Sequence, residues 1–139
     1  MSYDHPNRIK YTFGMLDFGT AGEVYSIKGP KGKAGRIYDY GVDAPLETFT
    51  ATTLPAYVSV GSVADPDLYG DEISMGTLAV DTGSKSLRTT YTEVEIGSKA
   101  VLLEPKVPAD TIIALHCTAP TGGTPAGMAH PYVIIDWDN

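Results

Sequence analysis

A period-two alternation of apolar and polar residues most constrains how this chain can fold. In the stretch TIIALHCTA, residues 111–119, Ile113, Leu115 and Cys117 fall on one side of an extended chain and His116 on the other. Comparable runs, rich in β-branched and aromatic residues and bounded by Gly, Pro, Asn and Asp, recur along the sequence. They lie at 22–28, 36–42, 46–51, 56–63, 77–80, 89–96, 100–105 and 131–137. The pattern predicts about eight short strands.

Short strands at short, regular spacing are typical of a sandwich or a barrel, so the predicted fold is all-β. Within that class we predict an antiparallel β-sandwich that is jelly-roll-like. A chain of 139 residues can bury one hydrophobic core, and we expect one sandwich domain over residues 21–139. Residues 1–20 alternate poorly, so we expect an extended N-terminal arm that orders on a partner. Only 65–76 is expected to hold a helical turn.

The distribution of charge restricts the class of partner. The net charge is -7, which argues against general nucleic-acid binding. Six basic and three acidic residues between positions 1 and 36 give that part +3 and leave -10 for residues 37–139. A basic end on an acidic body suggests contact with an acidic partner, while scattered surface charge is the alternative. Both interpretations stay open at this point.

The sequence also carries expectations about location. No apolar run approaches the roughly 18 residues of a membrane span, so we expect no membrane partner. The first residues lack the apolar segment of a signal peptide, and we expect a protein made and kept in a cytoplasm. The single cysteine, Cys117, allows no internal disulfide, which agrees with that compartment.

The stretch SIKGPKGKAG, residues 26–35, raises the question of a phosphate-binding loop, because glycine and lysine often hold phosphate together. A P-loop requires Ser or Thr after Gly-Lys and a helix after the loop. Here a strand-like run follows Gly35. We therefore interpret the stretch as a turn between two strands, and we expect Lys31 and Lys33 to stay in solvent or to contact an acidic neighbour.

Metal and catalytic motifs give no match. The run DPDLYGDE, residues 65–72, resembles the start of a calcium loop, but Tyr69 and Gly76 occupy positions where an EF-hand needs ligands. The three histidines are far apart in sequence, and His116 and Cys117 should point to opposite faces of their strand. No nucleophile elbow or zinc-protease motif is present. We expect no enzyme activity, no catalytic residue, no metal and no cofactor.

Three long stretches together resemble the small decoration, or cement, proteins of tailed bacteriophages. They are GKAGRIYDYGVDAPLETFTATTLPAYVSVG at 32–61, DPDLYGDEISMGTLAV at 65–80 and VPADTIIALHCTAPTGGTPAGMAHPYVIIDW at 107–137. The resemblance implies a jelly-roll sandwich that forms a homotrimer on the outer capsid surface and clamps neighbouring subunits of the major capsid protein. It also implies a virion protein made in the host cytoplasm. The family has no fixed binding motif, so no residue roles follow from the resemblance.

The residues expected to contact a partner come from the two basic segments. They are Arg8, Lys10, Tyr11, Phe13 and Phe18 in the N-terminal arm and Lys31 and Lys33 in the glycine-rich turn. Exposed rings in a free arm would dock on a neighbouring protomer or on an acidic groove of the coat protein. Three alternatives to a cement protein remain: a tail or baseplate sandwich, a jelly roll that binds a small ligand or carbohydrate, and a cupin-like enzyme.

Overall fold

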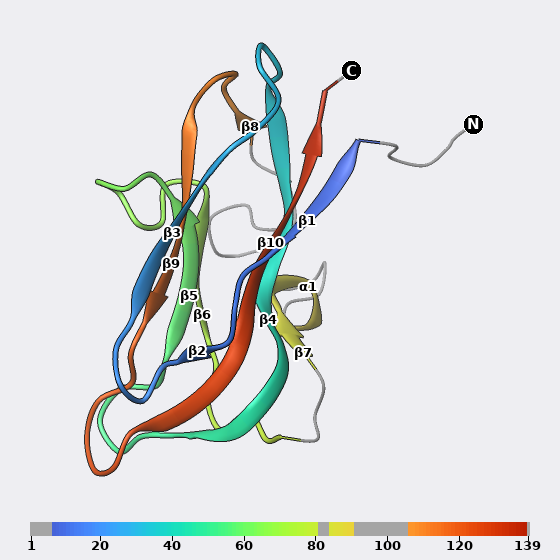
Figure 1. The fold of residues 1–139 in the computed structure, drawn as a ribbon. Helices are drawn as coiled ribbons and strands as arrows, with labels where there is room; N and C mark the ends of the chain where they lie inside the picture. The colour runs from blue at the N-terminus through green and yellow to red at the C-terminus, as the bar shows by residue number, and fades with distance from the viewer. Residues whose placement is uncertain (1–6, 81–83, 91–105, 139) are drawn as a thin grey trace.

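The structure, a computed structural model, describes residues 7–80, 84–90 and 106–138, which form two antiparallel sheets packed face to face (Figure 1). Sheet A contains β1 (Arg8–Thr12), β10 (Ala126–Trp137), β4 (Gly35–Thr50) and β7 (Ser84–Ser86) in this order, while β2 (Leu16–Asp17) pairs with β10 and β8 (Lys106–Val107) pairs with β4. Sheet B contains β3 (Glu23–Lys28), β9 (Ile112–Thr118), β5 (Tyr57–Gly61) and β6 (Gly70–Ser74). The predicted all-β antiparallel sandwich is confirmed, and its jelly-roll connectivity stays a prediction.

Alternation along the last two strands places the core as the sequence predicts. Ile113 and Leu115 of β9 are fully buried, and so are Val133 and Ile135 of β10. Cys117 and Trp137, which continue the two inward faces, are buried as well. His116 points away from this core and is only half-buried. The side chains of both strands meet between the sheets because successive residues of a strand face opposite sides.

Strand β4 differs from the prediction because it is one strand of 16 residues where the sequence suggested two. It pairs with β10 from Gly35 to Thr50, and register shifts on β10 on both sides of Met128 absorb the irregular stretch. Such bulges bend a strand pair without ending it. The paired strands consequently extend beyond the sandwich and curve beneath it (Figure 1).

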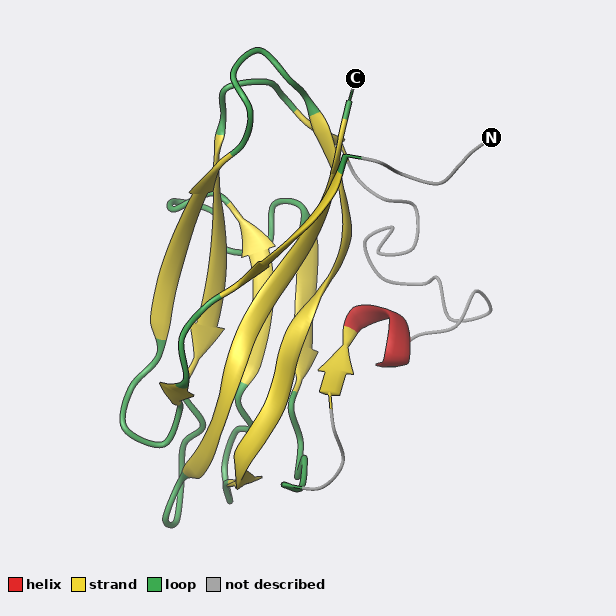
Figure 2. Cartoon of the chain, turned by 45° about the vertical axis from the view of Figure 1, so that its right-hand side comes forward, coloured by secondary structure: helices red, strands yellow, loops and turns green. Residues whose placement is uncertain are grey.

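Other differences concern short elements. The predicted helical turn within 65–76 is wrong, because residues 70–74 form β6. The predicted strand at 77–80 is absent, because a turn closes there with a hydrogen bond from the Leu78 amide to the Met75 carbonyl. One short helix, α1 (Leu87–Thr90), lies beside sheet A instead (Figure 2). The strand predicted at 100–105, and all of that at 89–96 except the last two residues of α1, lie outside the described residues.

The expectation of an N-terminal arm is wrong for residues 8–20, because these residues belong to the sandwich. All five residues of β1 pair with β10, and β2 pairs with β10 further along. Phe18 is fully buried and meets the ring of Phe49 edge to face, with centroids 5.1 Å apart. The physical reason is that the aromatic side chains of this segment can be buried against the sandwich of the same chain, and no partner is needed to shield them from water. Residues 1–6 of the expected arm lie outside the described part of the chain.

Candidate binding surfaces

Two cations predicted to bind a partner are paired on the outer face of sheet A. Arg8 donates to Asp136 through Nε and a terminal nitrogen, at 2.5 and 3.0 Å, and Lys10 forms an ion pair with Asp43. The hydrogen bond to Asp136 raises the pKa of Arg8. The Arg8 guanidinium also lies 3.5 Å from the ring centroid of Tyr38. Both cations therefore make contacts within sheet A, and their contact with a partner stays a prediction.

The three aromatic residues predicted to dock on a partner instead pack on the sandwich. Tyr11 accepts a hydrogen bond of 2.9 Å from Nε1 of Trp137. Phe13 stacks on Tyr25, with ring centroids 4.3 Å apart. Phe18 is inside the core and cannot reach a partner. These rings join the first strands of the chain to both sheets.

A buried carboxylate, Asp39, ties three elements together on the same outer face. It accepts hydrogen bonds from the backbone amides of Tyr40 and Arg88, at 2.9 and 3.1 Å. The Tyr132 hydroxyl lies 3.5 Å from its second oxygen. Burial raises the pKa of Asp39, and it also raises the pKa of the Tyr132 hydroxyl. Since these partners come from β4, α1 and β10, the arrangement is suited to holding α1 on the sheet.

The glycine-rich stretch connects β3 to β4, as the sequence predicts. A turn closes with a hydrogen bond of 3.1 Å from the Lys33 amide to the Pro30 carbonyl, and the Gly32 amide donates to Asp110 Oδ1 at 2.9 Å. Gly29 lies directly against the indole of Trp137, so any side chain at this position would overlap the ring. Lys31 remains exposed and Lys33 half-buried. The turn is thus fixed to the end of the last strand.

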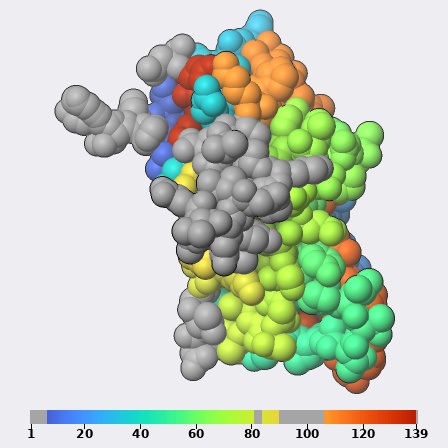
Figure 3. All heavy atoms as spheres, turned by 180° about the vertical axis from the view of Figure 1, so that it is seen from behind, coloured from blue at the N-terminus to red at the C-terminus, as the bar shows by residue number. Residues whose placement is uncertain are grey.

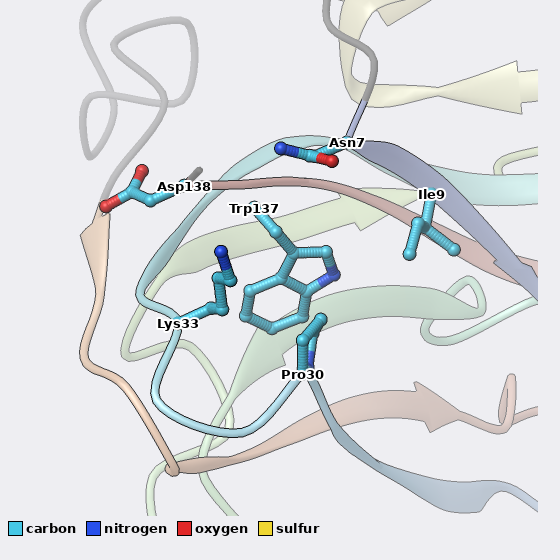
Figure 4. Close-up of a pocket in the computed structure, with 6 residues that line it drawn as sticks. All are labelled: Asn7, Ile9, Pro30, Lys33, Trp137 and Asp138. Carbon is cyan, nitrogen blue, oxygen red and sulfur yellow. The ribbon is translucent and has the colours of Figure 1, made fainter.

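A pocket forms where this turn meets the start of β1 and the end of β10. Its volume is about 210 Å³, and its lining consists of Asn7, Ile9, Pro30, Lys33, Trp137 and Asp138. Figure 4 shows the indole between Pro30 and Ile9, with the Lys33 amine and the Asp138 carboxylate nearby. We call it the Trp137 pocket. It brings together the N-terminal segment and the glycine-rich turn, the two basic segments that the sequence singled out separately.

The cations around the Trp137 pocket give this end of the molecule a positive charge. Residues 28–36, here called the basic hairpin, carry Lys28, Lys31, Lys33 and Arg36. Within the described ranges none of the four forms an ion pair. Carboxylates at this end include Asp110, which accepts from Gly32, Asp136, which pairs across the strands with Arg36, and Asp138 on the pocket lining. This positive charge is opposite in sign to the net charge of residues 37–139.

The connection between β5 and β6, residues 62–69, is a loop of opposite character that we call the acidic loop. Val63 and Leu68 expose 63% and 49% of their surface, although both are apolar. Asp65 is exposed between them, and no Lys or Arg occurs from 62 to 72. In Figure 1 this green loop projects to the left, while the start of β1 and the end of β10, which border the Trp137 pocket, lie at the upper right. In Figure 3, seen from behind, green atoms lie on the right, and the blue and red atoms of the first and last strands lie at the upper left.

Several hydrogen bonds hold the acidic loop against the outer face of sheet B. Ser59 Oγ donates to the Pro66 carbonyl at 2.9 Å, and Nε2 of His116 lies 2.8 Å from the Ser62 carbonyl. The backbone of the loop passes so close to Gly61 that a Cβ there would overlap the Asp65 carbonyl. The loop is therefore a fixed projection. The sequence indicated a turn here but did not indicate that the turn would be held against sheet B.

Groups with catalytic or metal-binding chemistry do not gather in the described part of the chain. No three His, Cys, Asp or Glu side chains among those residues could hold one metal ion. Burial raises the pKa of Cys117 to about 12, so its thiol stays protonated. The hydrogen bond between His116 and Ser62 involves the backbone carbonyl of Ser62 and not its hydroxyl group. No described helix has the length and apolar character needed to cross a membrane.

Comparison of the chain with known proteins found no matching protein-family model, no matching curated protein and no matching solved structure.

Proposed function

We propose that this chain is a structural decoration, or cement, protein of a tailed-phage capsid. It binds the outer capsid surface as a homotrimer and clamps neighbouring subunits of the major capsid protein. The observation that carries the proposal is a sandwich with two separate surfaces of opposite charge, the basic hairpin and the acidic loop. Several weak contacts made by the copies of a trimer on a lattice add up to firm attachment.

The distribution of charge and chemistry supports a bridging role. Arg8 and Lys10 are occupied within sheet A, whereas Lys31 and Lys33 remain available at the Trp137 pocket. The net charge of -7 disfavours binding to the packaged nucleic acid and suits an exterior position. The buried thiol of Cys117 offers no nucleophile. We accordingly propose a virion protein, made in the host cytoplasm, without enzyme activity or cofactor.

A small-ligand or carbohydrate-binding role has one observation in its favour, the Trp137 pocket. Sugars bind tryptophan by stacking on an exposed ring face, but the indole is only 6% exposed. Gly29 and Gly35 both lie against its ring. The pocket suits a single apolar side chain better than a flat sugar ring. A tail or baseplate sandwich would present the same surfaces, and the particle that it binds separates that alternative from a capsid protein.

Co-sedimentation tests the proposal. The chain is mixed with expanded capsids assembled from the coat protein of the same genome, and in parallel with isolated tails. We expect saturable binding to capsids and none to tails. Binding to tails alone would support the baseplate alternative, and binding to neither particle would overturn a virion role.

A further inference from the structure

The Trp137 pocket has the size and lining to receive one aliphatic side chain beside a carboxylate. Apolar cavities of about 150 Å³ hold a molecule the size of benzene, so about 210 Å³ leaves room for a leucine side chain. Ile9, Pro30 and Trp137 provide apolar contacts. Lys33 on the lining and Lys31 beside it provide positive charge. An acidic segment with an apolar tip is therefore the complementary occupant.

The acidic loop of this same chain has that composition. Leu68 is half-exposed at the surface, Val63 is more exposed still, and the Asp65 carboxylate lies between them in sequence. Glu72 adds a further exposed carboxylate in the middle of β6. The hydrogen bonds of Ser59 and His116 hold the loop in place before any partner arrives. A preorganised loop loses little conformational freedom on binding, which favours association.

We propose that the acidic loop of one copy docks in the Trp137 pocket of a second copy, with Leu68 as the apolar anchor and Asp65 facing Lys33. The inference rests on the proposed function only in naming the contact that builds its homotrimer. Contact of the positive hairpin with the negative loop steers the two copies together, while the buried apolar side chain supplies affinity.

The positions of the two surfaces determine the kind of assembly. The loop lies against the outer face of sheet B, whereas the pocket lies where β1 begins and β10 ends in sheet A, so the contact is not made by the same surface on both copies. Each copy instead uses its loop toward one neighbour and its pocket toward the other. Such head-to-tail contacts close into a ring when the rotation between copies allows it. A three-membered ring is the closed form that matches the proposed homotrimer.

Sedimentation equilibrium of the full chain, without capsids and at low and high salt, tests this contact. The variants are Lys33→Glu, Asp65→Lys and the double variant that carries both changes. Lys85→Glu on β7, at the opposite edge of sheet A from β1, makes the same charge change away from both surfaces and is the matched control. Circular dichroism establishes that each variant is folded.

We expect a closed oligomer for the wild-type chain and for Lys85→Glu. Each single reversal should weaken association about tenfold or more, and the double variant should recover most of the loss, because the charges again oppose each other. Leu68→Ser should weaken association at every salt concentration, since it removes apolar contact. A wild-type chain that is monomeric at every concentration overturns the proposal, as does a double variant that associates no better than either single variant.

Capsid binding is measured separately on the same proteins. A monomeric chain that still sediments with capsids overturns the loop-and-pocket contact and leaves the capsid-binding role standing. A chain that forms the ring but does not sediment with capsids supports the loop-and-pocket contact and contradicts capsid binding.

Discussion

Nε1 of Trp137 donates a hydrogen bond of 2.9 Å to the hydroxyl of Tyr11, and this bond joins the last strand of the sandwich to the first. Replacing Tyr11 by Phe leaves the indole N–H without this partner. We expect a loss of about 1 kcal/mol in the free energy of unfolding, measured by urea denaturation. Tyr57→Phe, at a half-buried position on β5, serves as the control and should change stability by less than about 0.5 kcal/mol. Equal losses for the two variants would contradict the structural role of the bond.

Deletion of residues 1–20 tests the corrected N-terminal boundary. The deletion removes β1, β2 and the buried ring of Phe18, and it exposes the edge of β10. A buried Phe alone contributes about 3–5 kcal/mol, a large share of the stability of a small domain. We expect the shortened chain to be unfolded or aggregated by circular dichroism. Deletion of residues 1–6 keeps every one of these contacts and is the control. A shortened chain with a cooperative thermal transition like that of the control would restore the arm interpretation.

A third prediction compares a buried and an exposed position on β9. Leu115 is fully buried, whereas Ile112 is 50% exposed at the start of the strand. Leu115→Ala should lower the free energy of unfolding by about 2–5 kcal/mol, because it leaves a cavity between the sheets. Ile112→Ala should cost less than about 1 kcal/mol. The comparison would count against the assigned faces if chemical denaturation ranked the two variants in the reverse order.

Asp39 should make stability depend on pH in a defined direction. Burial raises its pKa above the ordinary value of 3.8, so the folded chain binds this proton more tightly than the unfolded chain. Its contribution to stability is therefore fully present below the unfolded pKa and is lost as pH rises through the folded pKa. Asp39→Asn keeps a hydrogen-bond acceptor without the titration. We expect its stability relative to the wild type to increase from pH 3 to pH 8, and a constant or decreasing difference would refute the assignment.

The period-two pattern predicted the strands that have one face in the core. In β9 and β10 every second side chain is buried between the sheets, so alternation is strong in the sequence. The run RIKYT of β1 alternates too, through Ile9 and Tyr11, but it is short and its Ile9 is partly exposed. The other residues between positions 1 and 20 do not alternate, so the short alternation of β1 is not apparent in that segment as a whole. Edge position, rather than lack of structure, accounts for the weak pattern.

The Trp137 pocket and its relation to the acidic loop could not be predicted from local sequence. Asn7 and Trp137 are far apart along the chain, and only the pairing of β1 with β10 brings them together. The basic character of the hairpin was visible in Lys31 and Lys33, and the turn at 65–72 was visible in its Asp and Pro residues. The positions of the basic hairpin and the acidic loop relative to each other depend on how the two sheets pack. Pairing between distant strands is the information that short motifs do not contain.

A cryo-electron microscopy reconstruction of expanded capsids, assembled from the coat protein of the same genome and incubated with an excess of the chain, tests the capsid-binding claim most directly. We expect added density on the outer surface, into which three copies of the sandwich fit around a three-fold axis, each contacting more than one coat subunit. Capsids without added density at saturating protein concentration would contradict the claim.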